Sequence, residues 1–274
     1  MIKVNGEVIK IEHYPDGTQK LHIDHIFEWC CCDYNIDWRY EKEEELSSLI
    51  YITRHLKQIP NCRIFLKMFY LPNARMDRVQ SWDEVFTLKG FADVINWLEF
   101  DSVKILDVHS NVGAAVFNKL TILLPEAYIA NVINEINNKN SDLILYFPDA
   151  GAAKRYSNMF PEYKYCYGEK KRDWDTGKIL GLDIKSNGIN LSGKTILMID
   201  DIVAYGGSLY YSANTLKNWG VDKIYAFATH TENSVLNREK GTLIKSLEDN
   251  TVERLFTTDS IFTGKHEKIT VMEV

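Results

Sequence analysis

The chain has 274 residues, of which 45% are hydrophobic, 26% charged and 12% aromatic, and its formal net charge is −6. This composition is typical of a globular protein and argues against disordered, collagen-like and coiled-coil chains. The acidic balance argues against nucleic-acid binding through overall charge, although a local basic cluster can still bind a phosphate. No apolar run approaches the roughly 18–20 residues of a membrane helix, and the polar N-terminus has no signal-peptide core, so we expect a cytoplasmic protein.

The five cysteines give no sign of a disulfide framework. They are Cys30, Cys31, Cys32, Cys62 and Cys166. Three adjacent cysteines cannot all pair, the total is odd, and the spacing lacks the paired knuckles of a zinc site. We therefore expect reduced, mostly buried thiols.

The apolar pattern predicts alternating strands and helices. The first 26 residues predict two strands joined by a turn at Tyr14-Pro15-Asp16-Gly17. Further strands are predicted over 62–68, 103–107, 142–147, 194–200, 222–228 and 252–256. Amphipathic helices are predicted near 40–57, 87–98, 125–139, 207–218 and 233–247. This alternation predicts an α/β fold with mainly parallel sheets, in which ligands bind at the carboxyl ends of the strands.

We expect two lobes, 1–140 and 141–274. The length suits two lobes of roughly 100–150 residues each. An alternative is that the last strand, over 268–272, returns to the first lobe.

The strongest local pattern spans 194–208, where an apolar strand ends in Asp200 and Asp201 and a glycine-rich turn follows. Adjacent carboxylates at a strand end can accept hydrogen bonds from two neighbouring hydroxyls of a ribose, or bind a divalent metal. Glycines permit close approach of a ligand, and the N–H groups at a helix start attract phosphate. The alternative is a plain strand-turn-helix with an acidic helix cap.

The segment at 194–208 resembles the ribose-phosphate loop of type I phosphoribosyltransferases and of phosphoribosyl pyrophosphate synthetases, the ribose-phosphate pyrophosphokinases. Five further segments are similar to synthetase motifs and follow the same order: Tyr14–Thr18, Tyr70–Arg78, Asp107–Ser110, Phe147–Arg155 and the basic run Lys170–Arg172. Five motifs in the family's order are more specific than any one alone, so the resemblance to the synthetases covers residues 14 to about 260.

The resemblance implies two phosphoribosyltransferase-like lobes, the first binding ATP and the second binding ribose phosphate. It implies Mg²⁺-dependent transfer of the β,γ-pyrophosphoryl group of ATP to the anomeric hydroxyl of a ribose 5-phosphate moiety, with release of AMP. The residues that it assigns to ATP are Tyr14, Asp16, Arg75, Asp77, Arg78 and His109. Those that it assigns to the other roles are Lys170 and Arg172 for catalysis, Asp200 and Asp201 for the ribose, and His109 and Asp149 for the metal.

The chain departs from the family where the sugar's 5-phosphate is held. The family reads Asp-Thr-x-Gly-Thr there, whereas this chain reads Ala204-Tyr205-Gly206-Gly207-Ser208. An aromatic ring and the loss of a carboxylate suit a bulkier 5-substituent. We therefore weigh two acceptors almost equally, ADP-ribose slightly ahead of ribose 5-phosphate. ADP-ribose pyrophosphate synthetases of this kind, which serve NAD⁺ rebuilding, are known in bacteriophages, so a short phage-like variant in the host cytoplasm is one expectation.

Two other classes stay open. A type I phosphoribosyltransferase would use the same loop. It would not need Tyr14–Thr18 and Arg75–Arg78, the segments that resemble ATP-binding motifs. A non-catalytic synthetase-associated protein would not need Lys170 and Arg172. The partners expected are ATP and a ribose-phosphate-containing small molecule, with no nucleic acid and no membrane. Because Tyr14–Thr18 resembles a segment that completes a neighbouring subunit's ATP site, we also expect a homo-oligomer, a dimer or higher.

Overall fold

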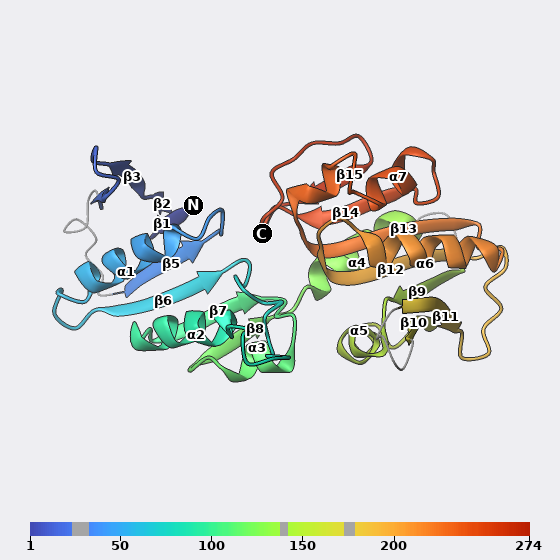
Figure 1. Ribbon diagram of the computed structural model, residues 1–274, viewed down its shortest axis with the longest axis horizontal. Helices are drawn as coiled ribbons and strands as arrows, with labels where there is room; N and C mark the ends of the chain where they lie inside the picture. The colour runs from blue at the N-terminus through green and yellow to red at the C-terminus, as the bar shows by residue number, and fades with distance from the viewer. Residues whose placement is uncertain (24–32, 138–141, 173–178) are drawn as a thin grey trace. The chain divides into compact units, whose positions relative to one another are not determined.

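The computed structural model describes residues 1–23, 33–137, 142–172 and 179–274 of the chain. These residues form two compact units, Met1–Leu124 and Pro125–Val274. Each unit contains a mainly parallel sheet flanked by helices, which confirms the predicted fold class (Figure 1). Within the described ranges, no helix is both long and apolar enough to cross a membrane.

The first unit is built on a six-stranded sheet of order β2-β1-β5-β6-β7-β8. Its strands are β1 (Ile2–Val4), β2 (Glu7–Val8), β5 (Asp33–Trp38), β6 (Arg63–Met68), β7 (Ser102–Leu106) and β8 (Leu120–Leu123). Pairing is parallel from β5 to β8, whereas β1 runs antiparallel to both β2 and β5. The connecting helices are α1 (Glu45–Leu56), α2 (Thr87–Trp97) and the short α3 (Asn111–Ala115). The carboxyl ends of β5 to β8 therefore share one edge.

A separate two-stranded sheet precedes β5. It is the predicted hairpin, with β3 (Lys10–His13) antiparallel to β4 (Gln19–His22). The turn closes through a hydrogen bond from the Gly17 backbone N–H to the Tyr14 carbonyl, 2.9 Å long. The hairpin is fastened to α1, because the Ser48 hydroxyl donates to Gln19 Oε1 at 2.8 Å.

The second unit is built on a seven-stranded sheet of order β11-β10-β9-β12-β13-β14-β15. Its strands are β9 (Leu143–Phe147), β10 (Tyr165–Arg172), β11 (Ile179–Lys185), β12 (Thr195–Val203), β13 (Lys223–Thr231), β14 (Arg254–Thr258) and β15 (Ile269–Met272). All neighbours pair in parallel except β10 and β11. Its α-helices are α4 (Glu126–Asn137), α5 (Ala150–Tyr156), α6 (Gly207–Asn218) and α7 (Leu243–Glu248).

Two apolar cores lie on opposite faces of this sheet, and β12 contributes side chains to both. Ile196 and Met198 pack on the face covered by α6 and α7, whereas Leu197 and Ile199 pack on the face covered by α4 and α5. This alternation follows from the two-residue period of a strand. A strand buried on both faces must be apolar throughout, so Asp200, at the end of this apolar run, marks the edge of the core.

Three expectations differ from the structure. The units divide after Leu124 rather than at 140, because α4 buries Ile129 and Ile133 against the second sheet. The last strand, β15, pairs with β14 in the second sheet and does not return to the first unit. The helix expected over 233–247 is a 3₁₀ turn followed by the short α7. The Asn237 side chain accepts the backbone N–H groups of 239 and 240 and so makes a turn where the helix would continue.

Candidate active site

Asp200 and Asp201 lie near the carboxyl end of β12, as predicted. The Asp201 side chain is buried, with its Oδ1 accepting the Ile202 backbone N–H at 2.8 Å, while Asp200 is partly buried. Burial, and after it the neighbouring Asp201 carboxylate, raises the pKa of Asp200 well above its usual value. Two carboxylates forced together in this way form a site that favours hydroxyl donors or a cation.

Hydrogen bonds to the backbone carbonyl of Tyr205 hold the turn after β12 in place. The Tyr205 carbonyl accepts hydrogen bonds from the Thr242 and Leu243 backbone N–H groups, at 2.9 and 3.2 Å, and from the Thr242 hydroxyl at 3.1 Å. Gly206 has φ +83°, and a Cβ on it would lie 2.2 Å from the Leu243 Cβ. The Tyr205 side chain is exposed on this fixed backbone.

Helix α6 begins directly after this turn. Its N-cap, Gly206, has no side chain with which to cap the first turn. The backbone N–H groups from Gly207 onward therefore form the kind of helix start at which phosphate binds in many proteins. Ala204, Tyr205, Gly206, Gly207 and Ser208 thus form one continuous loop between the aspartates and the helix.

Asp149 follows the neighbouring strand. It is the N-cap of α5, where its Oδ1 accepts the Ala152 backbone N–H at 2.9 Å. Since β9 and β12 pair in parallel, Asp149, just after β9, and Asp200, near the carboxyl end of β12, lie toward the same edge of the sheet. The Asp149 carboxylate also raises the pKa of Asp200, by less than burial and Asp201 do.

Sequence reasoning missed Arg155, in the last turn of α5. Its Nη1 donates to Asp201 Oδ2 at 2.9 Å. The available signal was indirect: Arg155 follows Asp149 by six residues, on a helix after a strand adjacent to β12. In the sequence alone, it looks like an ordinary basic residue near a helix C-terminus.

In the first unit, the predicted arginines follow β6. Arg75 lies on a turn closed by a 2.9 Å hydrogen bond from the Met76 backbone N–H to the Asn73 carbonyl, Arg78 follows two residues after the turn, and both arginines are exposed. Asp77 lies between them, with its Oδ1 3.8 Å from the Arg78 Nε. The segment therefore presents guanidinium groups with a carboxylate beside one of them.

His109 follows β7, the strand next to β6. Asp107, directly after β7, is buried and has φ +45°. Ser110 then caps α3 by accepting the Gly113 backbone N–H at 3.1 Å. Because β6 and β7 are parallel, His109 and the arginine segment emerge at the same edge of the sheet.

Tyr14 and Asp16 lie on the separate hairpin. Asp16 Oδ1 accepts the Thr18 hydroxyl at 2.7 Å and the Thr18 backbone N–H at 2.9 Å, which holds the pKa of Asp16 below its usual value. The Tyr14 side chain is 52% exposed. This turn is therefore ordered and carries an aromatic ring at its surface.

Lys170 and Arg172 belong to β10, which pairs with β11 and has a register irregularity between Lys171 and Arg172. Their side chains lie outside the described part of the structure. So do residues 173–178 and the cysteines Cys30, Cys31 and Cys32.

The carboxylates of the second unit fit a magnesium ion in their chemistry. Among the residues that the structure describes, no three or more His, Cys, Asp or Glu side chains gather to form a complete metal cage. Mg²⁺ is usually held by one or two carboxylates together with substrate phosphates and water. Asp149 and Asp200 supply such oxygens, and their mutual repulsion favours a cation.

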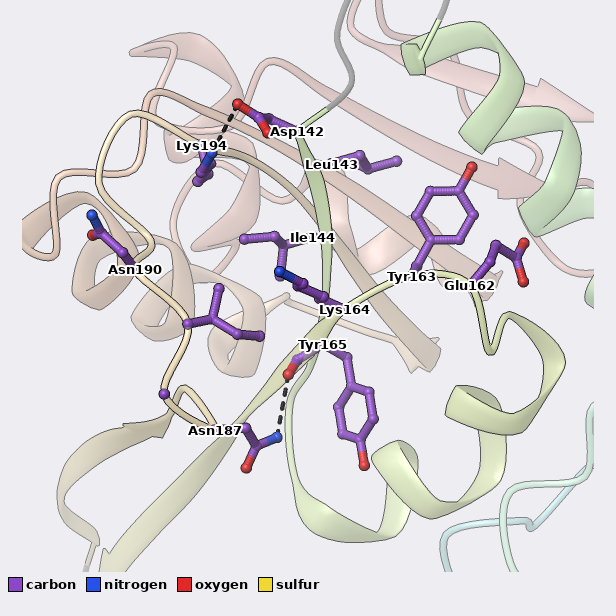
Figure 2. A pocket seen from close by; sticks show the side chains of 12 residues that line it. Asp142, Leu143, Ile144, Glu162, Tyr163, Lys164, Tyr165, Asn187, Asn190 and Lys194 are labelled. Carbon is purple, nitrogen blue, oxygen red and sulfur yellow. Dashed lines mark hydrogen bonds and ion pairs between the residues drawn. The ribbon is translucent and has the colours of Figure 1, made fainter.

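A cavity of about 800 Å³ lies at the opposite edge of the second sheet (Figure 2). It is lined by residues where β9, β10 and β12 begin, including the Asp142–Lys194 ion pair at 2.8 Å and the rings of Tyr163 and Tyr165. Ligands of parallel α/β sheets bind where the strands end. This cavity is therefore distinct from the aspartate site.

Comparisons with known proteins agree over almost the whole chain. The ribose-phosphate pyrophosphokinase of Sulfurisphaera tokodaii is 26% identical over 277 residues, covering 99% of this chain and 91% of that protein. That of Bacillus subtilis is 25% identical, with 94% and 79% covered, and ribose-phosphate pyrophosphokinase 2 of Enterococcus faecalis is 28% identical, with 82% and 68% covered. No family model matches the chain.

The fold comparison points the same way. The crystal structure of phosphoribosylpyrophosphate synthetase from Mycobacterium smegmatis superimposes with a TM-score of 0.75 at 17% identity, covering 97% of this chain and 86% of that one. Two mainly parallel sheets, with paired aspartates and a glycine turn after one of their strands, thus define an α/β protein with the synthetase fold. Within this class, the chain is similar over most of its length to proteins named ribose-phosphate pyrophosphokinase.

Proposed function

We propose that the chain transfers the β,γ-pyrophosphoryl group of ATP to the anomeric hydroxyl of a ribose 5-phosphate moiety and releases AMP. The observation that carries this proposal is the end of β12, where Asp200 and Asp201 precede a turn with a fixed backbone and the uncapped start of α6. In such a reaction the protein chiefly positions the reactants and neutralises charge. The sequence relatives, named ribose-phosphate pyrophosphokinases, support it.

Each group of residues has a role in this proposal. Asp200 and Asp201 accept hydrogen bonds from the ribose hydroxyls, and the loop 204–208 binds the 5-substituent. Arg75, Arg78 and His109 bind the ATP phosphates, and Asp77 orients Arg78. Lys170 and Arg172 stabilise charge on the transferring group. Mg²⁺, for which the motifs suggest His109 in the first unit and Asp149 in the second as candidate ligands, would neutralise phosphate charge when bound.

The test is the product spectrum. Purified protein with ATP and Mg²⁺ is offered ribose 5-phosphate or ADP-ribose, and AMP and the pyrophosphorylated sugar are quantified. AMP formation that depends on a sugar supports the proposal. The absence of AMP with either sugar would refute it, and would favour a phosphoribosyltransferase or a non-catalytic relative.

A pair of variants tests the basic run. Lys170→Ala combined with Arg172→Ala should lower kcat by at least about 100-fold, because each charge-assisted contact that is lost costs about 1.5–3 kcal/mol. Lys171→Ala is the matched control, since no role is assigned to it. Unchanged turnover in the double variant would show that this run is not catalytic.

For the acceptor, we propose ADP-ribose slightly ahead of ribose 5-phosphate. Tyr205 supports this choice, because its backbone carbonyl accepts three hydrogen bonds while the residue, within the loop 204–208, is 41% exposed. An exposed ring of this kind can pack against a base or sugar beyond the diphosphate. Tyr205→Thr should then raise the KM for ADP-ribose more than that for ribose 5-phosphate. A wild-type preference for ribose 5-phosphate of tenfold or more would refute the choice.

We also propose that two or more copies of the chain assemble and share the ATP site. The support is the exposed Tyr14 on an ordered hairpin turn, in a segment that resembles a shared family motif. If so, mixing Tyr14→Ala with the Lys170/Arg172 double variant should restore part of the activity, because one site receives both intact elements. A wild-type protein that is active and monomeric at assay concentration would refute sharing.

A further inference from the structure

Arg155 connects two elements of the acceptor site. It lies in the last turn of α5, the helix that Asp149 caps at its start, and it forms an ion pair with Asp201 on the neighbouring strand β12. The Nη1–Oδ2 distance is 2.9 Å, and the side chains are 29% and 8% exposed, respectively. A pair so well shielded from water holds its geometry better than an exposed one.

The second oxygen of Asp201 is held as well. Oδ1 accepts the Ile202 backbone N–H at 2.8 Å, so the carboxylate is fixed from both sides. A carboxylate oxygen can accept more than one hydrogen bond, so these contacts do not by themselves prevent recognition of a hydroxyl. The orientation of Asp201 is therefore set before a sugar arrives, which lowers the entropic cost of binding.

The Arg155 guanidinium also offsets the negative charge of two adjacent carboxylates. Asp200 and Asp201 are adjacent in sequence. The residues of β12 that precede Asp200 are apolar and buried. Two carboxylates at such a position repel each other, and a cation on one of them reduces that repulsion. Lys154, next to Arg155 in the same turn, is exposed and has no ion pair to Asp201 among those found in the described residues.

A purely structural brace is the simpler alternative. Buried ion pairs, however, add little net stability compared with apolar packing, because desolvation offsets the attraction. The position of this pair, directly on a carboxylate assigned to the sugar, gives it a second use. We propose that Arg155 is a positioning residue, which fixes Asp201 for recognition of the acceptor's hydroxyl groups. This inference rests on the proposed function of Asp201.

The test compares Arg155→Met, Arg155→Lys and the matched control Lys154→Met in the full-length protein. KM and kcat are measured for ATP and for the better acceptor, and thermal unfolding is followed by circular dichroism. Arg155→Met should raise the acceptor KM at least about tenfold, as expected for a lost charge-assisted hydrogen bond, and leave the KM for ATP within about twofold. Arg155→Lys should recover part of the loss, and Lys154→Met should match wild type.

A second measurement asks whether Arg155 acts through Asp201. If it does, Arg155→Met should add little to the acceptor KM in an Asp201→Asn background. An unchanged acceptor KM in Arg155→Met, equal increases for ATP and acceptor, or fully additive effects with Asp201→Asn would each overturn the proposal. So would failure of both Arg155 variants to fold, because the residue would then be a structural brace.

Titration calorimetry measures the dissociation constants of ribose 5-phosphate and ADP-ribose, so the role of Arg155 in sugar binding is tested independently of turnover. If wild type binds a sugar but forms no AMP, the proposed reaction fails while the Arg155 comparison can still be made on dissociation constants. If wild type turns over and Arg155→Met binds the sugar equally well, the inference about Arg155 fails alone.

Discussion

Gly206 is the position in the loop 204–208 at which an added methyl group should lower stability most. An alanine there must keep φ near +83°, which costs about 1–2 kcal/mol for an L-residue. Its Cβ would also lie 2.2 Å from the Leu243 Cβ and 3.2 Å from the Leu243 backbone nitrogen, and overpacking of this kind costs about 1–3 kcal/mol. We therefore expect Gly206→Ala to lower the free energy of unfolding of the second unit by about 2–5 kcal/mol.

Gly188 provides a matched control for the two contributions. It lies in the same unit with φ +78°, and a Cβ on it would meet nothing within 4 Å. Gly188→Ala should therefore show the backbone cost alone, about 1–2 kcal/mol. Urea unfolding followed by circular dichroism gives both values, compared at a common m value. If the two variants lose the same stability within about 0.5 kcal/mol, the contact with Leu243 costs nothing and the reasoning is wrong.

Two further predictions concern the buried face under α6. Ser212→Ala removes the acceptor of the buried Tyr146 hydroxyl, 2.8 Å away, and should cost about 1–3 kcal/mol by urea unfolding. Adding Tyr146→Phe should restore part of this stability, and no recovery would contradict the explanation. Burial raises the pKa of the Cys166 thiol to about 12, so native protein treated with iodoacetamide at pH 8 should stay unmodified there by peptide mass spectrometry. Modification of Cys166 as fast as that of the less buried Cys62 would contradict it.

The fold was predictable where apolar runs are continuous. β9 and β12 are buried along most of their length, so their strands stand out in the sequence. β5 was missed because Asp33–Trp38 has no continuous apolar run, although its alternation of buried apolar with polar residues is itself a strand pattern. The short edge strand β8 was missed because its middle residues are exposed.

The site was predictable as far as local motifs reach. Asp200, Asp201 and the glycine turn are contiguous, so the sequence places them together. The Arg155–Asp201 pair joins residues 46 positions apart, and only the pairing order of β9 and β12 brings them within reach. The hydrogen bonds from Thr242 to the Tyr205 carbonyl were not predictable for the same reason. They join residues that are distant in sequence, because the chain comes back to Tyr205 only after β13. The prediction of reduced, buried thiols holds for Cys166, which is fully buried.

The acceptor loop, its clamp at Thr242 and Leu243, and Arg155 all belong to Pro125–Val274. The segments that follow β6 and β7 belong to Met1–Leu124. Under the proposed function, mutations that change the sugar preference would therefore fall within one half of the gene. A lineage would then change its acceptor by recombination within that half, and the half proposed to bind ATP would be inherited unaltered.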